Sequence, residues 1–268
     1  MLHVKEWTLD CGDMQFDCIR FGTGSRPLVM IQGLNTRGIR GAGLGLAWMY
    51  RSFAREYTVY LFDRRAQVHE GITVRDMAAD LARCMELQGI RNADVFGVSQ
   101  GGMIAQYLAI DHPALVRRIV LAVTLSRSNE TVTRVVEGWI DMARSADMKR
   151  LVADMAQKMY SQAYLRRYRP LLPLLTLVQK PKDVERFAIL ARACLTCNAY
   201  AELDRIRCPV LVLGGREDQV VTGAASEEIA RKLGCGLLLY EGLGHAAYEE
   251  AKDFNDVVLD FLKGGEKR

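Results

Sequence analysis

The stretch Val95-Phe96-Gly97-Val98-Ser99-Gln100-Gly101-Gly102 decides the fold of this 268-residue chain. Residues 93–98 are mostly β-branched, aromatic or small, a composition typical of a buried strand. From residue 100 to about residue 110 the apolar side chains recur near helical spacing, and the pattern ends before His112-Pro113. The stretch therefore predicts a strand, a sharp turn that carries Ser99, and a helix.

The turn has the spacing Gly97-x-Ser99-x-Gly101, which is the nucleophile-elbow pattern. A serine on such a turn is held in strained backbone geometry with its hydroxyl exposed, and the two glycines avoid clashes there. The start of the following helix adds free N–H groups and a positive dipole beside the serine. Because the pattern also arises by chance, its meaning depends on partners elsewhere in the chain.

Strands and helices alternate on both sides of this turn. Continuous apolar runs predict strands covered on both faces, and hence a parallel, doubly wound sheet. Alternating apolar and polar residues at 3–10 and 14–22 predict an antiparallel hairpin at a sheet edge. The other predicted strands are residues 27–31, 57–62, 93–98, 118–123, 209–213 and 236–240. The predicted helices are residues 46–55, 73–88, 100–110, 223–233 and 248–263.

Residues 126–200 interrupt this alternation because they contain no strand pattern. The segment is helical in pattern, is punctuated by prolines, and carries the basic run Arg166-Arg167-Tyr168-Arg169, whose arginines we expect to face solvent. We interpret it as an inserted helical cap. The predicted organisation is a core formed by residues 1–125 and 201–268, with a cap of residues 126–200.

The composition is that of a globular protein with ample core, since half of the residues are hydrophobic and a quarter are charged. The net charge of +4 is too small and diffuse for a nucleic-acid footprint. No apolar run reaches the length of a membrane span, and the N-terminus lacks a signal-peptide layout. Seven scattered cysteines fit reduced thiols better than disulfides. We therefore expect a cytoplasmic monomer or homodimer that binds a small molecule, with neither nucleic acid nor membrane as a partner.

A serine hydroxyl becomes a nucleophile when a base takes its proton, and an acidic group must orient that base. In this arrangement of strands and helices, the expected chain order is serine, acid, histidine. His245 follows the last predicted strand in a loop with two glycines, and it is the expected base. Asp218, which follows the strand at 209–213, is the expected acid, with Glu217 as the alternative. The other histidines are His3, His69 and His112.

The oxyanion that forms during acyl transfer needs preorganised N–H donors. The backbone N–H of Gln100 lies at the start of the helix after the serine and is one candidate. The loop after the strand at 27–31, Gln32-Gly33-Leu34, supplies the other, for which we choose the Leu34 N–H. The side chains of Gln32 and Leu34 need not matter, because the backbone donates.

Together these motifs make the chain resemble an α/β-hydrolase fold protein with a helical cap. The resemblance covers nearly the whole length and is weakest in residues 126–200. It rests on the elbow, on Gly102 after it, on Asp218 after Val-Leu-Val-Leu-Gly-Gly, and on Gly244-His245. Two departures are visible. Gln32 stands where the family usually has histidine, and Asp63-Arg64-Arg65 lacks the glycine-rich continuation common after that strand.

The resemblance implies a serine hydrolase of a small-molecule ester or lactone, without cofactor or metal. A carbon–carbon bond hydrolase and a cofactor-free haloperoxidase share the triad and stay open as alternatives, as does a ligand-binding or signalling module that keeps the pocket. Serine at the elbow argues against haloalkane dehalogenases and epoxide hydrolases, which would require aspartate there. We expect the substrate to contact Gly33 and the apolar cap residues Trp139, Met155 and Leu174.

Overall fold

The computed structural model describes residues 2–168 and 181–265. Within them, eight strands form one sheet in the order β1-β2-β4-β3-β5-β6-β7-β8. The strands are β1 (Lys5–Asp10), β2 (Gln15–Phe21), β3 (Arg26–Ile31), β4 (Tyr57–Phe62), β5 (Ala93–Val98), β6 (Val116–Ala122), β7 (Val210–Gly215) and β8 (Gly236–Tyr240). β1 and β2 form an antiparallel hairpin at one edge, β2 pairs antiparallel with β4, and all further pairs are parallel. The predicted doubly wound, mostly parallel sheet is confirmed.

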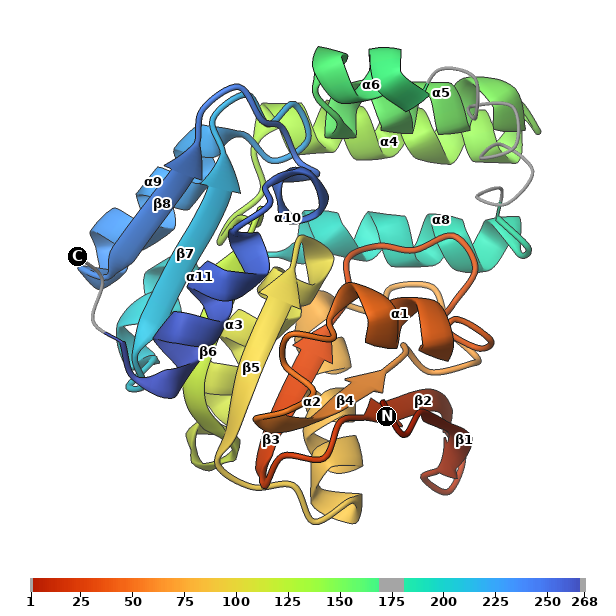
Figure 1. Cartoon of the computed structure of the whole chain (residues 1–268). Coiled ribbons are helices and arrows are strands. Elements are labelled where there is room, and N and C mark those ends of the chain that lie inside the picture. Colours follow the sequence, from red (N-terminus) through yellow and green to blue (C-terminus); the bar gives the residue numbers. More distant parts are fainter. Residues whose placement is uncertain (1, 169–180, 266–268) are drawn as a thin grey trace.

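Helices connect the parallel strands and cover both faces of the sheet (Figure 1). They are α1 (Gly43–Met49), α2 (Val74–Leu87), α3 (Gln100–Asp111), α4 (Glu130–Arg144), α5 (Met148–Met159), α6 (Gln162–Tyr168), α8 (Val184–Ala193), α9 (Gly223–Leu233), α10 (Ala247–Glu250) and α11 (Phe254–Lys263). Short 3₁₀ turns lie at Pro113–Leu115, Cys194–Thr196 and Tyr200–Arg205.

Two predicted helices were wrong in extent. α1 spans Gly43–Met49 instead of 46–55, because the Glu6 carboxylate accepts from the Gly41 and Gly43 N–H groups and so allows an earlier start. The predicted helix at 248–263 is two helices, since Ala251 has extended backbone between α10 and α11. Both differences depend on contacts or backbone conformation that local periodicity does not encode.

The apolar core has one layer on each face of the sheet, because side chains alternate between the faces along each strand. On β5, Val95 belongs to the layer packed by α2 and α3, whereas Phe96 and Val98 belong to the layer packed by α1 and α11. Both layers are closely covered: Val95 is fully buried and Phe96 is 1% exposed. β5 is thus fixed on both sides, and so is the turn that follows it.

The chain reverses direction across the sheet between β3 and β5. It passes from β3 outward to β4 and then crosses back to place β5 on the opposite side of β3. Ligands of open α/β sheets bind at such a switch point, beyond the carboxyl ends of the strands. Figure 1 shows α4, α5, α6 and α8, which all come from between β6 and β7, beyond those same strand ends.

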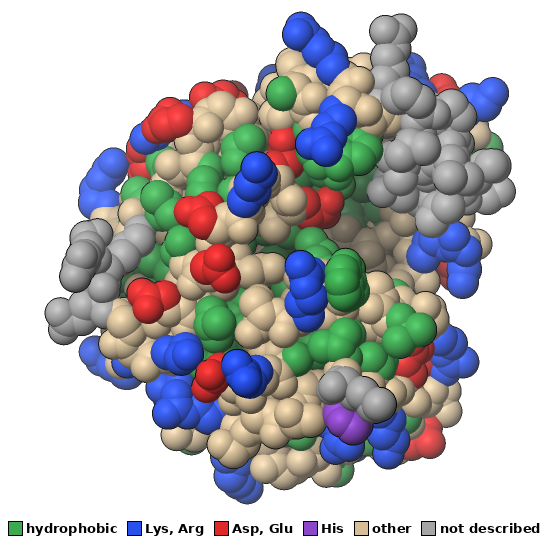
Figure 2. Space-filling view, viewed as in Figure 1, with side chains coloured by type: hydrophobic (Ala, Val, Ile, Leu, Met, Phe, Trp, Pro, Cys, Tyr) green, Lys and Arg blue, Asp and Glu red, His purple; other side chains and the backbone are tan. Residues whose placement is uncertain are grey.

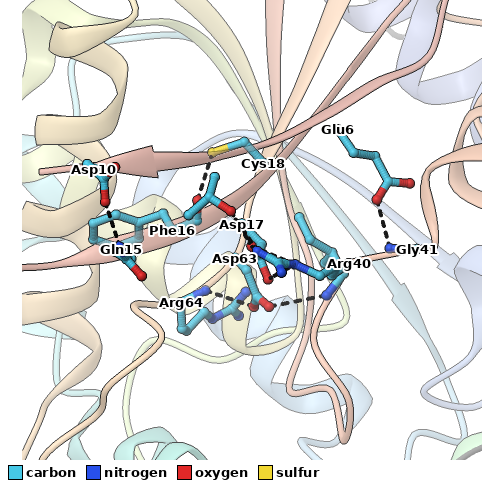
Figure 3. A network of polar contacts seen from close by, with 12 residues as sticks. Glu6, Asp10, Gln15, Phe16, Asp17, Cys18, Arg40, Gly41, Asp63 and Arg64 are labelled. Carbon is cyan, nitrogen blue, oxygen red and sulfur yellow. Dashed lines mark hydrogen bonds and ion pairs between the residues drawn. The ribbon is translucent and has the colours of Figure 1, made fainter.

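A polar network ties the N-terminal hairpin to the loop before α1. Figure 3 shows Asp17 and Arg40 pointing toward one another, and their closest side-chain atoms are 2.6 Å apart. The Glu6 carboxylate accepts from the Gly41 N–H at 2.7 Å. Asp63, at the end of β4, accepts from the Ile39 N–H at 3.2 Å and from the Arg64 N–H at 2.8 Å. The edge hairpin therefore braces the loop that begins at the carboxyl end of β3.

Candidate active site

Ser99 sits on a strained turn between β5 and α3. Its φ of 53° and ψ of −118° are uncommon for a residue with a side chain. The turn is possible because the residues that flank it are glycines. Other backbone comes so close to them that a side chain would not fit. A Cβ on Gly97 would lie 2.5 Å from the Gly101 oxygen, and one on Gly101 would lie 2.0 Å from the Ile31 oxygen. The Ser99 N–H donates to the Ala122 oxygen at 2.8 Å, which holds the turn against β6.

Two hydrogen bonds connect the three residues expected to act together. The Nε2 atom of His245 lies 3.0 Å from the Ser99 Oγ, and its Nδ1 atom lies 2.8 Å from the Asp218 Oδ2. His245 is 4% exposed and Asp218 is 6% exposed, so water competes little for these contacts. The Asp218 Oδ1 is held separately by the Val220 and Val221 N–H groups. The carboxylate is thereby fixed with one oxygen turned to the imidazole.

The alternative acid, Glu217, does not reach the histidine. Its side chain is exposed, and its backbone N–H donates to the Leu243 oxygen at 3.0 Å. That bond attaches the loop after β7 to the loop that carries His245. Of the two neighbouring carboxylates, the structure brings only Asp218 to the site.

The two expected oxyanion donors lie on adjacent segments around Ser99. Gln100 is the first residue of α3, where backbone N–H groups have no intrahelical partner. The loop after β3 passes close to the serine, since a Cβ on Gly33 would lie 3.3 Å from the Ser99 Cβ. Within the described residues, neither the Gln100 N–H nor the Leu34 N–H donates a hydrogen bond to another protein group. Both therefore stay candidate donors for the oxyanion.

A buried arginine behind these donors was missed in the sequence. Arg64 is 7% exposed, and its guanidinium donates to the Gln32 oxygen at 2.5 Å and to the Gln100 Oε1 at 2.9 Å. The Gln100 side chain also reaches α8, since its Nε2 donates to the Leu190 oxygen at 2.6 Å. The available signal was the departure at Asp63-Arg64-Arg65, where one residue separates an arginine from a buried strand.

A cavity of about 200 Å³ adjoins the loop after β3. Its walls come from β3, β4, β5, α1, α10 and the loop after β3 and are mostly apolar, and Glu249 is its one acidic side chain among the described residues. The lining residues are Met30, Ile31, Gln32, Gly33, Leu34, Asn35, Leu46, Met49, Tyr50, Leu61, Phe96, Val98, Tyr248 and Glu249. In Figure 2 the surface is hollowed between the helices beyond the strand ends and the sheet below, with hydrophobic side chains gathered along the hollow.

The residues expected to contact substrate are distributed differently. Gly33 lines the cavity, but Trp139 and Met155 do not. Trp139 is 4% exposed inside the helical layer, where its Nε1 donates to the Asp154 Oδ2 at 2.8 Å. Met155 is half-buried and packs against the core. Leu174 lies outside the described residues, as does Arg169, while Arg166 and Arg167 are exposed.

The junction of α5 and α6 is bonded to the segment after His245. The Ala246 N–H donates to the Met159 oxygen at 2.8 Å, and the Tyr160 hydroxyl donates to the Glu249 Oε2 at 2.7 Å. The surrounding protein desolvates the Glu249 carboxyl and raises its pKa, although the side chain keeps contact with solvent. The helical segment therefore contacts the histidine loop on one side and Gln100 on the other.

The described residues contain no group of three His, Cys, Asp or Glu side chains that could hold a metal ion, and no helix in them is long and apolar enough to cross a bilayer. The pair Cys194 and Cys197 is buried, and burial raises the pKa of the Cys194 thiol to about 11. This value keeps the thiol protonated and unreactive at neutral pH.

One family model matches most of the chain. Residues 34–257 match the sequence model of the alpha/beta hydrolase family. The curated protein "Putative carbamate hydrolase RutD" of Caulobacter sp. (strain K31) is 26% identical over 239 residues, which cover 85% of this chain and 88% of that protein.

Two solved structures share the fold across nearly their full length. The hydrolase MGS-M2, from a Medee basin deep-sea metagenome library, has a TM-score of 0.84 at 19% identity and covers 98% of this chain and 99% of its own. The enol-lactonase from Burkholderia xenovorans LB400 has a TM-score of 0.83 at 22% identity, over 96% of this chain and 100% of its own. At these identities the likeness concerns the fold.

Proposed function

Because this chain belongs to the alpha/beta hydrolase family, we propose that it is a serine hydrolase that cleaves a small-molecule ester or lactone through Ser99, His245 and Asp218. The observation that carries the proposal is the continuous pair of hydrogen bonds from Asp218 through His245 to the Ser99 Oγ. The chain order of these residues is the one that the fold uses.

In the proposed first half-reaction, the Ser99 Oγ attacks the substrate carbonyl carbon while the His245 Nε2 takes the hydroxyl proton. Asp218 fixes the ring with its Nδ1–H directed at the carboxylate and stabilises the imidazolium that forms. The carbonyl oxygen becomes an oxyanion and accepts from the Leu34 and Gln100 N–H groups. His245 then gives the proton to the leaving alcohol oxygen, the carbon–oxygen bond breaks, and an acyl-enzyme remains.

The second half-reaction repeats these steps with water. His245 takes a proton from a water molecule, whose oxygen attacks the acyl carbon and forms a second oxyanion in the same place. Collapse of this intermediate breaks the bond to the Ser99 Oγ, which regains its proton from His245. The products are a carboxylic acid and an alcohol, or a single hydroxy acid from a lactone.

The cavity next to Gly33 is small and mostly apolar, which supports a substrate with a small, largely apolar acyl group. Relatives named as an enol-lactonase and as a carbamate hydrolase also support cleavage of a carbonyl–heteroatom bond. We further propose that residues 126–200 act as a cap, since the end of α5 and the junction before α6 contact the segment after His245, and α8 contacts Gln100.

Pre-steady-state hydrolysis of p-nitrophenyl esters tests this proposal. We expect a burst of p-nitrophenol equal to the enzyme concentration, followed by slower turnover, because acylation and deacylation are separate steps. The Ser99→Ala variant should lose both phases. Steady turnover that survives in Ser99→Ala would contradict the mechanism, and the absence of ester or lactone turnover by the parent enzyme would contradict the substrate class.

A further inference from the structure

Arg64 places a positive charge in the protein interior beside the expected oxyanion hole. Its guanidinium donates to three neutral acceptors, which are the Gln32 oxygen, the Gly33 oxygen at 3.4 Å and the Gln100 Oε1. Among the described residues, no carboxylate lies within ion-pairing distance of this guanidinium. Arginine stays protonated in proteins, so the charge is present and uncompensated by a direct partner.

The charged groups around Arg64 do not neutralise its positive charge through a direct ion pair. Asp63 is next to it in sequence, but its carboxylate oxygens accept from the Arg64 and Ile39 N–H groups of the backbone. Arg186, from α8, approaches from the other side and donates to the Arg64 backbone oxygen at 3.2 Å. Burial, opposed by Asp63 and assisted by Arg186, lowers the pKa of Arg64. Burying a cation in this way is costly unless its hydrogen bonds are satisfied.

The acceptors of Arg64 lead directly to the two oxyanion donors. The Gly33 oxygen and the Leu34 N–H belong to the same peptide unit. A cation bound to the carbonyl end of a peptide polarises it and makes its N–H a stronger donor. The Gln100 side chain, which Arg64 holds by both Nε and Nη2, belongs to the residue that supplies the second N–H. One guanidinium therefore joins the loop after β3 to the start of α3.

We propose that Arg64 is a positioning residue of the oxyanion hole, which holds both N–H donors in place and strengthens them with its unpaired buried charge. The inference rests on the proposed serine-hydrolase function. The charge acts most on the tetrahedral intermediate, where the carbonyl oxygen is negative, and little on the neutral substrate. Arg64 should therefore affect kcat and leave KM nearly unchanged.

The test compares Arg64→Met with the parent enzyme on p-nitrophenyl acetate. Methionine keeps an unbranched side chain but removes the charge and the donors. We expect kcat to fall about 10²-fold, as on loss of an oxyanion donor, with KM changed by less than threefold. Arg65→Met is the matched control, because Arg65 is the next residue and pairs with Asp80 away from the donors. It should keep the parent kcat even where its stability falls.

Two inhibitors separate positioning from a general loss of structure. A trifluoromethyl ketone adds to the serine and forms an oxyanion, whereas the corresponding methyl ketone binds as a neutral molecule. In Arg64→Met, the inhibition constant of the first should rise about 10²-fold and that of the second should stay within threefold. An unchanged ratio of the two constants, or a parent-like kcat, overturns the inference.

Gln100→Glu supplies a second test that keeps Arg64 in place. The new carboxylate would pair with the guanidinium and neutralise its charge, so kcat and trifluoromethyl ketone binding should again weaken together. Parent-like values in a folded Gln100→Glu variant would overturn the inference. Failure of the proposed function is distinguishable, because it would remove Ser99-dependent ester turnover from the parent enzyme itself.

Discussion

The Nε2 atom of His245 lies 3.0 Å from the Oγ of Ser99, although 146 positions separate the two residues in the chain. The contact forms because both residues follow parallel strands of one sheet, whose carboxyl ends meet at the same edge. Ser99 follows β5 directly, and His245 lies in the loop after β8.

Replacing Asp218 should reduce turnover, whereas replacing Glu217 should leave turnover unchanged. Asp218→Asn keeps the shape of the side chain but removes the charge that orients and stabilises the imidazolium. We expect kcat on p-nitrophenyl acetate to fall about 10⁴-fold, the size seen when a serine protease loses this group. Glu217→Gln is the control, since that side chain is exposed. The reverse pattern would show that Glu217 orients His245.

Enlarging the cavity should move the preference toward longer acyl chains. Met49 lines the cavity from α1, and Met49→Ala would add room beside the apolar wall. We expect kcat/KM to rise for p-nitrophenyl hexanoate relative to the acetate, by several-fold for each extra methylene accommodated. Met142→Ala, in α4 and outside the cavity lining, should leave the ranking of esters unchanged. If Met142→Ala changes the ranking and Met49→Ala does not, the cap residues set specificity.

Glu249 should disfavour anionic acyl groups. Its carboxylate lines the cavity, so a p-nitrophenyl monoester of glutaric acid should react more slowly than the butyrate ester. Glu249→Gln should improve kcat/KM for the anionic ester relative to the butyrate by roughly fivefold, from about 1 kcal/mol of charge repulsion. Glu250→Gln is the control, because the Glu250 carboxylate is bound to Ser161 and does not line the cavity. An equal preference in Glu249→Gln and the parent enzyme would exclude this role.

The raised pKa of Glu249 makes the free energy of unfolding depend on pH, and the sign of that dependence follows from the direction of the shift. A carboxyl whose pKa is raised on folding binds its proton more tightly in the folded state. Its contribution to the free energy of unfolding is therefore largest below its unfolded pKa and declines as pH rises through the folded value. Denaturant unfolding between pH 4 and 8 should show a decline in the parent protein that Glu249→Gln lacks. Parallel curves for the two proteins would contradict the raised pKa.

The elbow glycines should be essential for folding and not only for catalysis. A Cβ on Gly101 would lie 2.0 Å from the Ile31 oxygen, which is backbone and cannot give way cheaply. Gly101→Ala should lower the free energy of unfolding by about 3 kcal/mol or more. Gly45→Ala, in α1, meets nothing within 4 Å and should be neutral or slightly stabilising. Urea unfolding measures both, and equal stability of the two variants would contradict the packing around the elbow.

Much of the fold could be predicted because its signals are local. The strand at 57–62, the strand at 93–98 and the helix at 223–233 coincide with β4, β5 and α9. These segments have continuous apolar or helical periodicity and clear ends. The extent of α1 could not be predicted, since its early start depends on Glu6, which is 37 positions away from Gly43.

The candidate site could likewise be predicted where its signals are local, and not where they depend on contacts between distant residues. Ser99, Asp218 and His245 could be named because the elbow spacing and the chain order are readable in one sequence. Arg64 could not, because its partners are backbone oxygens of a loop 31 and 32 positions earlier and a side chain 36 positions later. The lining of the cavity was also unpredictable, since it depends on how α1 and α10 pack over β3 and β5.

The most direct test of the central claim is the covalent labelling of the intact protein with a fluorophosphonate, followed by peptide mapping. We predict one label per chain on the Ser99 Oγ, no labelling of Ser99→Ala, and much slower labelling of His245→Ala. A label on another serine, or a parent protein that stays unlabelled while it hydrolyses esters, would contradict the assignment of Ser99 as the nucleophile.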